Sequence, residues 1–255
     1  MIVVERRFCG PPGSGHGGYV AGLLAAAVGE PAEVTLRLPP PLERALDVVR
    51  TGDGTASLVD GDRVIAEAKV IAHVDVDVPD PIRFADAEAA ADAGRAALES
   101  FAFRTCFACG TDRSAPDGLA LAFGPVAGRD DGVHAAPWVP DPSLADDDGN
   151  VRPEFVWAAL DCPGVSPLLG AGGAGSAFVL GRLAVERLGP VPVGYRYIVL
   201  SRLVGRDGRK GHVSVVLTTD MGDVRARARA TWIEVDGAAF EADTGASEKR
   251  TRRGD

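Results

Sequence analysis

Two short helical segments with almost no charged side chains constrain the fold of this chain more than any other feature. The first runs from Tyr19 to Val28 and the second from about Glu154 to Leu160. A helix that is apolar on all sides must be buried on most of them. Strand-like stretches follow each segment, so we expect two helices, each covered by a sheet.

The stretches around the first helix have the pattern of an antiparallel sheet. A β-branched strand at Ile2–Val4 precedes the helix, and Asp60-Gly61 after it is a hairpin signal. In the longest stretch, apolar residues alternate with polar ones, which indicates one buried face and one solvated face. The predicted strands after the helix are Ala32 to Leu38, Arg44 to Thr51, Ala56 to Val59 and Val64 to Val78.

The second half of the chain repeats this plan. An alanine-rich helical segment with many charges, Ala85 to Glu99, has the composition of a connector between the two halves. In the last strand arginines alternate with alanines, which places the alanines on the inner face. The predicted strands are Leu119 to Phe123, Val133 to Val139, Phe178 to Arg187, Pro192 to Val204, His212 to Thr219 and Val224 to Val235.

The repeated order of strand, apolar helix and antiparallel strands predicts an α+β fold. A sheet that curls around one buried helix is the hotdog arrangement, so we expect a double hotdog. The predicted parts are an N-terminal unit (1–80), a helical linker (81–104), a C-terminal unit (105–240) and a disordered tail (241–255). The two sheets should join edge to edge, because each unit alone leaves an exposed edge strand.

Composition excludes several partners. The formal net charge is -9 and the sequence pI is near 5.0, so nucleic acid and anionic membranes are not expected partners. No stretch approaches the ~20 apolar residues that span a bilayer, and no signal peptide is evident. We therefore expect a cytoplasmic protein whose four cysteines are reduced thiols.

Four short motifs resemble the thioesterase superfamily. Cys106–Gly110 and Asp117–Phe123 resemble the opening of many hotdog proteins of that superfamily. His16–Gly18, before an apolar helix, resembles the phenylacetate-pathway thioesterases, and Trp157–Gly164 resembles a helix of actinobacterial tandem-hotdog proteins. The resemblance implies an acyl-CoA or acyl-carrier thioesterase-type hydrolase without a cofactor, and a homodimer of double-hotdog chains is the partner expectation.

Thioester hydrolysis needs hydrogen-bond donors for the developing oxyanion and a base or nucleophile. A helix N-terminus offers unpaired N–H groups, and glycines there allow close approach of a substrate. His16, Gly17 and Gly18 fit this first requirement. The glycines could equally serve only a tight turn, and the resemblance favours the functional interpretation.

The second requirement is a carboxylate. In thioesterases with the histidine–glycine–glycine motif it lies nine positions after the histidine, where this chain has Ala25. Asp161 lies nine positions after Arg152, which is followed by Pro153 and Glu154 instead of glycines. One helix therefore keeps the donors and the other keeps the acid.

Hotdog sites form between paired units, so a tandem chain can divide one site between its halves. The expected catalytic residues are His16 and Asp161, and the expected substrate-binding residues are Gly17, Gly18, Tyr19, Glu154 and Trp157.

Other interpretations remain open. Asp161 could be a helix-terminating residue before Cys162-Pro163-Gly164, and Ala25 favours a non-catalytic binder of acyl thioesters or small hydrophobic ligands. A hotdog lyase is disfavoured, because Asp207 and His212 flank a hairpin turn and not a helix start.

The cysteines do not predict a metal site from their spacing. Cys106 and Cys109 form half of a zinc motif, but no second pair stands at suitable spacing. Cys9 and Cys162 would have to complete the motif across the domains, so we expect metal-free thiols. Cys162 as a nucleophile would need a base, and none is evident in the sequence.

Overall fold

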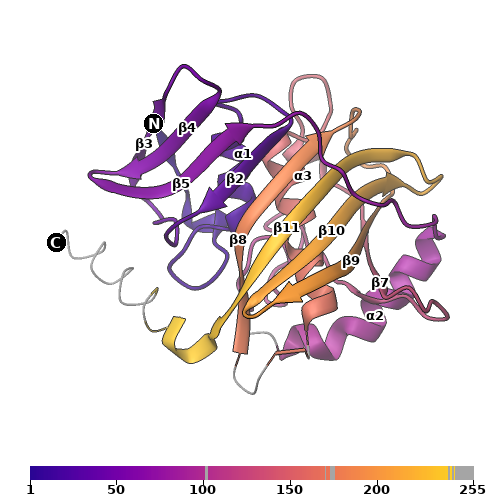
Figure 1. Cartoon of the computed structure of the whole chain (residues 1–255). Coiled ribbons are helices and arrows are strands. Elements are labelled where there is room, and N and C mark those ends of the chain that lie inside the picture. The colour runs from indigo at the N-terminus through magenta and orange to yellow at the C-terminus, as the bar shows by residue number, and fades with distance from the viewer. Residues whose placement is uncertain (101–102, 170, 173–175, 241, 243, 245–255) are drawn as a thin grey trace.

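The computed structural model describes residues 1–100, 103–169, 171–172, 176–240, 242 and 244. Among these residues, eleven strands form one sheet in the order β1-β3-β4-β5-β2-β8-β11-β10-β9-β7-β6. Two helices, α1 (Gly17–Ala25) and α3 (Pro153–Asp161), pack against each other on one face of this sheet (Figure 1). The tail predicted to be disordered, 241–255, falls almost entirely outside the described residues.

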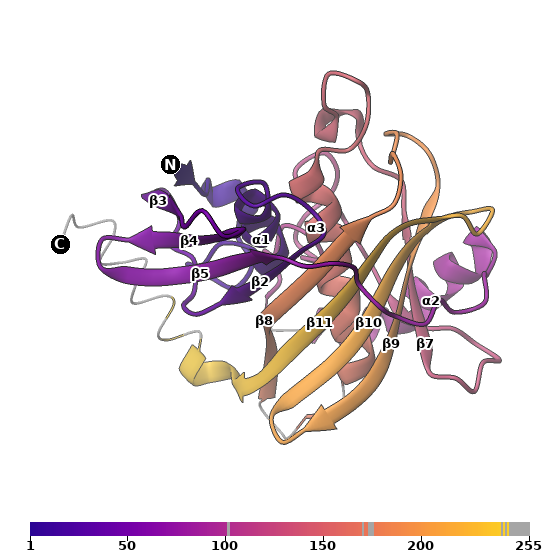
Figure 2. The same ribbon diagram turned by 45° about the horizontal axis from the view of Figure 1, so that its top comes forward.

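The strands of the first half surround α1. Strand β5 ends at Val70, so the prediction of a strand as far as Val78 is wrong. Val70 is paired with Ala32, the first residue of β2, and beyond it the Ile71 N–H still donates to the Pro31 carbonyl before the ladder ends. Residues 71–83 instead cross the outer face of the sheet toward the next helix (Figure 2). The strands are β1 (Ile2–Val3), β2 (Ala32–Leu36), β3 (Ala45–Arg50), β4 (Thr55–Asp60) and β5 (Arg63–Val70).

The strands of the second half are longer. The predicted strand Leu119 to Phe123 is wrong, because the Leu119 and Leu121 N–H groups donate to the carbonyls of Phe107 and Ala108 in a loop. The strands are β6 (Gly124–Pro125), β7 (Val133–Trp138), β8 (Ser176–Arg187), β9 (Tyr197–Asp207), β10 (Lys210–Thr219) and β11 (Val224–Asp236). The alternation in β11 is confirmed, since its alanines are fully buried and Arg229 is exposed.

The two halves share one continuous sheet, as predicted. Strands β2 and β8 pair antiparallel from Ala32 opposite Val185 to Thr35 opposite Arg182. The pairing satisfies the edge that each half would otherwise expose. No helix of the described residues is long and apolar enough to cross a membrane.

Helix α2 (Phe84–Glu99) is more than the connector that its charges suggest. Ala87, Ala90 and Gly94 are buried, and the helix packs on β6 and β7. A side chain at Gly94 would collide with the carbonyl oxygen of Phe123. One small-residue face of α2 therefore covers the end of the sheet, while its charges face outward.

Glycines let α1 and α3 approach closely in antiparallel orientation. A Cβ atom on Gly18 would lie 2.6 Å from Cβ of Asp161, and one on Gly22 would lie 2.6 Å from Cα of Glu154. The start of α1 therefore lies against the end of α3. This crossing brings Gly18 of the first half against Asp161 of the second half.

We predict that Gly22→Ala destabilises the protein by roughly 1–2 kcal/mol. Overpacking costs about 1–3 kcal/mol, more than the gain of up to about 1 kcal/mol for alanine over glycine in a helix. Urea unfolding measures the change. Gly205→Ala is the control, because a Cβ there meets no atom within 4 Å, and equal effects of the two substitutions would contradict the prediction.

Candidate active site

The site is built where the start of α1 meets the end of α3. His16 is the N-cap of α1, and its Nδ1 accepts a hydrogen bond of 3.2 Å from the Tyr19 N–H. Asp161, the last residue of α3, accepts one of 2.7 Å at Oδ2 from the Gly18 N–H. A carboxylate is favoured at the positive end of a helix dipole. Asp161 therefore caps the helix of the other half. The alternative interpretation, that Asp161 only terminates its own helix, does not explain this contact.

The His16 ring faces the carboxylate and a thiol. Its Nε2 lies 3.5 Å from Asp161 Oδ2 and 3.3 Å from Cys162 Sγ. Because Nδ1 accepts from a backbone N–H, the neutral ring carries its proton on Nε2. The structure thus supplies Cys162 with the neighbouring imidazole that the sequence did not reveal.

Burial controls the ionisation of this pair. Burial raises the pKa of Asp161 to about 6, although His16 and the Gly18 N–H oppose the shift. Burial alone would lower the pKa of His16, but Cys106 and Asp161 raise it by more, so the pKa lies above its ordinary value. Asp161 Oδ1 is buried with no hydrogen-bond partner among the described residues. Oδ2 of the carboxylate therefore binds the start of α1, whereas Oδ1 is removed from solvent.

A cluster of thiols lies beside the His16–Asp161 pair. All four cysteines are free and buried, and Cys106 Sγ lies 3.6 Å from Cys162 Sγ. Hydrogen bonds with Cys109 and Cys162 hold the pKa of Cys106 well below its ordinary range. Cys106 and Cys162 are therefore neighbours, because the end of α3 reaches the loop before β6.

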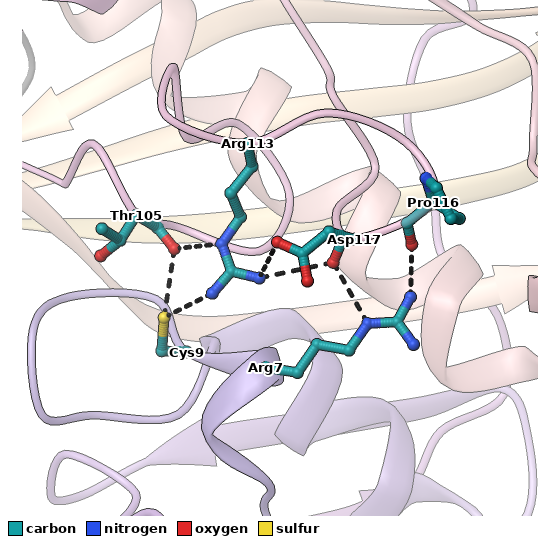
Figure 3. A network of polar contacts seen from close by, with 6 residues as sticks. All are labelled: Arg7, Cys9, Thr105, Arg113, Pro116 and Asp117. Atoms are coloured by element: carbon teal, nitrogen blue, oxygen red, sulfur yellow. Dashed lines mark hydrogen bonds and ion pairs between the residues drawn. The ribbon is translucent and has the colours of Figure 1, made fainter.

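Arginine contacts fix the loop that carries Cys106 to the first half of the chain (Figure 3). Arg113 donates to the Thr105 carbonyl at 2.7 Å, to the Asp117 carboxylate at 3.2 Å and to Cys9 Sγ at 3.2 Å. Arg7 donates to the carbonyls of Asp117, at 3.2 Å, and Pro116. The Phe107 N–H also donates to the Cys9 carbonyl at 2.7 Å. These contacts place Cys106 over the start of α1.

A cavity of about 210 Å³ opens beside these groups. His16, Asp161, Cys106 and Cys162 line it, together with Gly17. Its other walls are mostly apolar, which is typical of ligand sites with a few polar groups. The apolar lining includes Leu36, Leu38, Val165, Phe178, Leu180 and Trp232, none of which the sequence analysis assigned.

Four predicted site residues do not line this cavity, although one of them, Gly18, donates its N–H to Asp161, which does. Tyr19 is stacked on Phe8 and Phe155, and Trp157 donates from Nε1 to Glu30 at 2.7 Å. Glu154 lies at the start of α3, at the other end of the helix pair. The structure brings together His16, Gly17, Gly18 and Asp161, but it does not bring Tyr19, Glu154 or Trp157 to the cavity.

Comparisons with known proteins identify the fold. No protein-family profile and no curated protein sequence matches the chain. The tesB protein of Mycobacterium avium subs paratuberculosis is similar over 87% of each chain, with a TM-score of 0.54 and 12% identity. A putative thioesterase of Ralstonia eutropha JMP134, described as phenylacetic acid degradation-related, is 22% identical, with a TM-score of 0.41, over 45% of this chain and 85% of its own.

The chain spans about half, 54%, of a further thioesterase superfamily protein, which matches 46% of this chain with 16% identity and a TM-score of 0.40. At such identities the similarity shows the fold alone. The chain therefore has a hotdog-type fold, similar over most of its length to that of the tesB protein.

We predict that His16→Ala is less stable than His16→Asn by about 0.5–2 kcal/mol, the usual effect of losing an N-cap. Asparagine retains an acceptor for the Tyr19 N–H, whereas alanine does not. Both variants lose Nε2, so their difference isolates the cap. Urea unfolding of the two variants provides the measurement, and identical midpoints would show that His16 does not cap α1.

Proposed function

We propose that this chain is a double-hotdog acyl-thioester hydrolase with one composite site between its two units. Its substrate is an acyl-CoA or an acyl-carrier thioester. The observation that carries the proposal is the Asp161 carboxylate of the second half, which lies in an apolar cavity and is bonded to the helix start of the first half.

The arrangement of the helices supports the pseudo-dimer. Residues 1–80 contribute α1 with β1 to β5, and residues 105–240 contribute α3 with β6 to β11. Because the two helices run antiparallel, the donors at the start of one meet the acid at the end of the other. At the opposite end of the pair, the matching position is Ala25, which cannot act as a base. One active site for each chain follows.

In the proposed mechanism, Asp161 activates water. Its unpartnered Oδ1 accepts a proton from a water molecule that attacks the thioester carbonyl carbon. The C–S bond of the tetrahedral intermediate then breaks to give the carboxylic acid, and Asp161 returns the proton to the leaving thiolate. The His16 Nε2–H and the Gly17 N–H donate to the carbonyl oxygen as negative charge develops there. Gly17 is the first residue of α1, so its N–H has no acceptor within the helix.

The cavity supports a small acyl group. Its volume of about 210 Å³ lies below the ~300–1,000 Å³ of pockets that enclose drug-sized ligands. The apolar walls suit a short hydrocarbon chain or a ring, while the carrier would remain outside. A cytoplasmic location and a homodimer remain predictions from the sequence.

We predict that Asp161→Asn lowers thioester hydrolysis by roughly 10²–10⁴-fold, the share of one positioned acid–base group. The amide oxygen still accepts the Gly18 N–H but has little basicity. Steady-state hydrolysis of a series of short acyl-CoA thioesters, followed by thiol release, gives the rate. Substrate affinity, measured by calorimetry, should be retained because the pocket contacts are mostly apolar.

Glu33→Gln is the matched control for the loss of a carboxylate. Glu33 is also buried, but it pairs with Lys69 on the opposite face of the sheet and does not line the cavity. It should retain the wild-type rate. Hydrolysis unchanged in Asp161→Asn would remove Asp161 from the mechanism.

A non-catalytic binder is the second candidate, and one contact favours it. The Gly18 N–H, an expected oxyanion donor, is occupied by Asp161 in this structure. If wild-type protein binds acyl thioesters by calorimetry but releases no thiol from any of the series, the binder interpretation replaces the hydrolase.

A further inference from the structure

We propose that His16, Cys106 and Cys162 form a Zn²⁺ site at the inner end of the cavity. The ligand atoms are His16 Nε2 and the two Sγ atoms, and all three lie within 4.8 Å of one another. Each residue is buried and lines the cavity, which provides a path for the ion.

The distances between the ligand atoms already approach those of a tetrahedral zinc site. Zn–S bonds of about 2.3 Å and Zn–N bonds of about 2.0–2.1 Å give edges of roughly 3.8 Å between two sulfurs and 3.6 Å between sulfur and nitrogen. The observed edges are 3.6 Å from Cys106 Sγ to Cys162 Sγ and 3.3 Å from His16 Nε2 to Cys162 Sγ. Small outward movements of the side chains would admit the ion.

The charges balance when the ion binds. Zn²⁺ displaces one proton from each thiol, so that Zn²⁺ and two Cys–SH groups give Zn(Cys–S⁻)₂ and two H⁺. The two thiolates neutralise the ion, which avoids an unpaired charge in a buried place. No oxidant or reductant takes part.

One hydrogen bond has to be exchanged for the metal. His16 Nδ1 now accepts from the Tyr19 N–H at 3.2 Å, but a ring bound through Nε2 carries its proton on Nδ1. Binding therefore opens this contact and replaces it by a coordination bond. The Gly18 N–H keeps its acceptor on Asp161, so the start of α1 remains capped.

The loop holds Cys106 in place independently of any metal. Cys106 and Cys109 have the C-x₂-C spacing of zinc ligands, and the Gly110 N–H donates to the Cys106 carbonyl at 2.9 Å. The Arg113 contacts in Figure 3 brace the same loop internally, at Thr105, and join it to Cys9. The proposal replaces the expectation of metal-free thiols, which considered only distance along the chain.

The donor set has a known chemistry. Zinc sites with three protein ligands keep an open position, and one His with two Cys serves in such sites beside a carboxylate that is not a ligand. Asp161 stands in that relation to the three ligands here. The proposal does not rest on thioester hydrolysis, because metal content is measured without a substrate.

The test begins with the wild-type full-length chain, purified under a reducing agent and incubated with zinc. Native mass spectrometry should show a mass increase of one zinc minus two protons. Cobalt titration of chelator-treated protein should give the sulfur-to-cobalt charge-transfer absorption and the visible bands of a tetrahedral site. Absence of bound metal, or a cobalt spectrum without thiolate charge transfer, would overturn the proposal even if no variant folds.

Variants then locate the ligands. Cys106→Ser and Cys162→Ser should lose the zinc, and His16→Asn should bind it more than about 10-fold more weakly. Cys9→Ser is the matched control, because this buried cysteine contacts Thr105 and Arg113 outside the three-ligand group. Zinc retained in either of the first two variants, or lost equally in Cys9→Ser, would overturn the assignment, as would a Cys106–Cys162 disulfide that persists under the reducing agent.

Asp161→Asn distinguishes the two proposals. Zinc on His16 Nε2 replaces the N–H that the proposed hydrolysis uses, so hydrolysis is measured on chelator-treated protein. We expect this variant to keep its zinc after incubation with the ion and to lose the hydrolysis of the metal-free protein. Zinc bound by a wild-type protein whose metal-free form hydrolyses no thioester would leave the metal site standing and remove the proposed function. Hydrolysis by a wild-type protein that binds no metal would do the reverse.

Discussion

The crossing of α1 and α3 is the contact on which the rest of the structure depends. Gly18 and Gly22 allow a backbone approach that any side chain would block, and this approach inserts Asp161 against the start of α1. The Gly18 N–H then finds its acceptor on the other half of the chain. The shared sheet through β2 and β8 fixes the halves in the orientation that this contact requires.

Burial of polar groups at this crossing explains their chemistry. Asp161 is 2% exposed, and loss of water raises the pKa of its carboxyl group to about 6. Such a group is tolerated because a backbone N–H and the His16 imidazole lie against it. The same groups are concentrated at one wall of an apolar cavity, which is the usual arrangement of a site that orients a ligand.

The loop before β6 adds chemistry that the helices alone do not have. Arg7 and Arg113 attach this loop to the first half of the chain, and the attachment places Cys106 beside Cys162 and His16. Three elements far apart in the sequence thus supply one group of buried ligand atoms. The proposed hydrolysis and the proposed metal site use the same wall of the cavity and exclude each other at His16 Nε2.

The sequence by itself determined the two buried helices and most of the strands. Apolar periodicity located both buried helices and most strands, since burial on one face places apolar residues once per turn in a helix and at every second residue in a strand. Periodicity wrongly predicted strands at residues 71–78 and 119–123, because a strand also needs a neighbouring strand with free backbone groups. The sequence also paired His16 with Asp161 through a family resemblance.

Only the tertiary structure decided what surrounds that pair. Side chains such as Cys162, Leu180 and Trp232 meet at the cavity from separate elements, and no local pattern records such a meeting. For the same reason, the prediction that assigns Trp157 and Glu154 to the site from their positions on the helix is wrong, because their side chains lie elsewhere. Distance along the chain does not determine distance in space once a helix end and a loop are packed together. The packing of the end of α3 against the loop before β6 brings Cys106, Cys162 and His16 to one wall of the cavity.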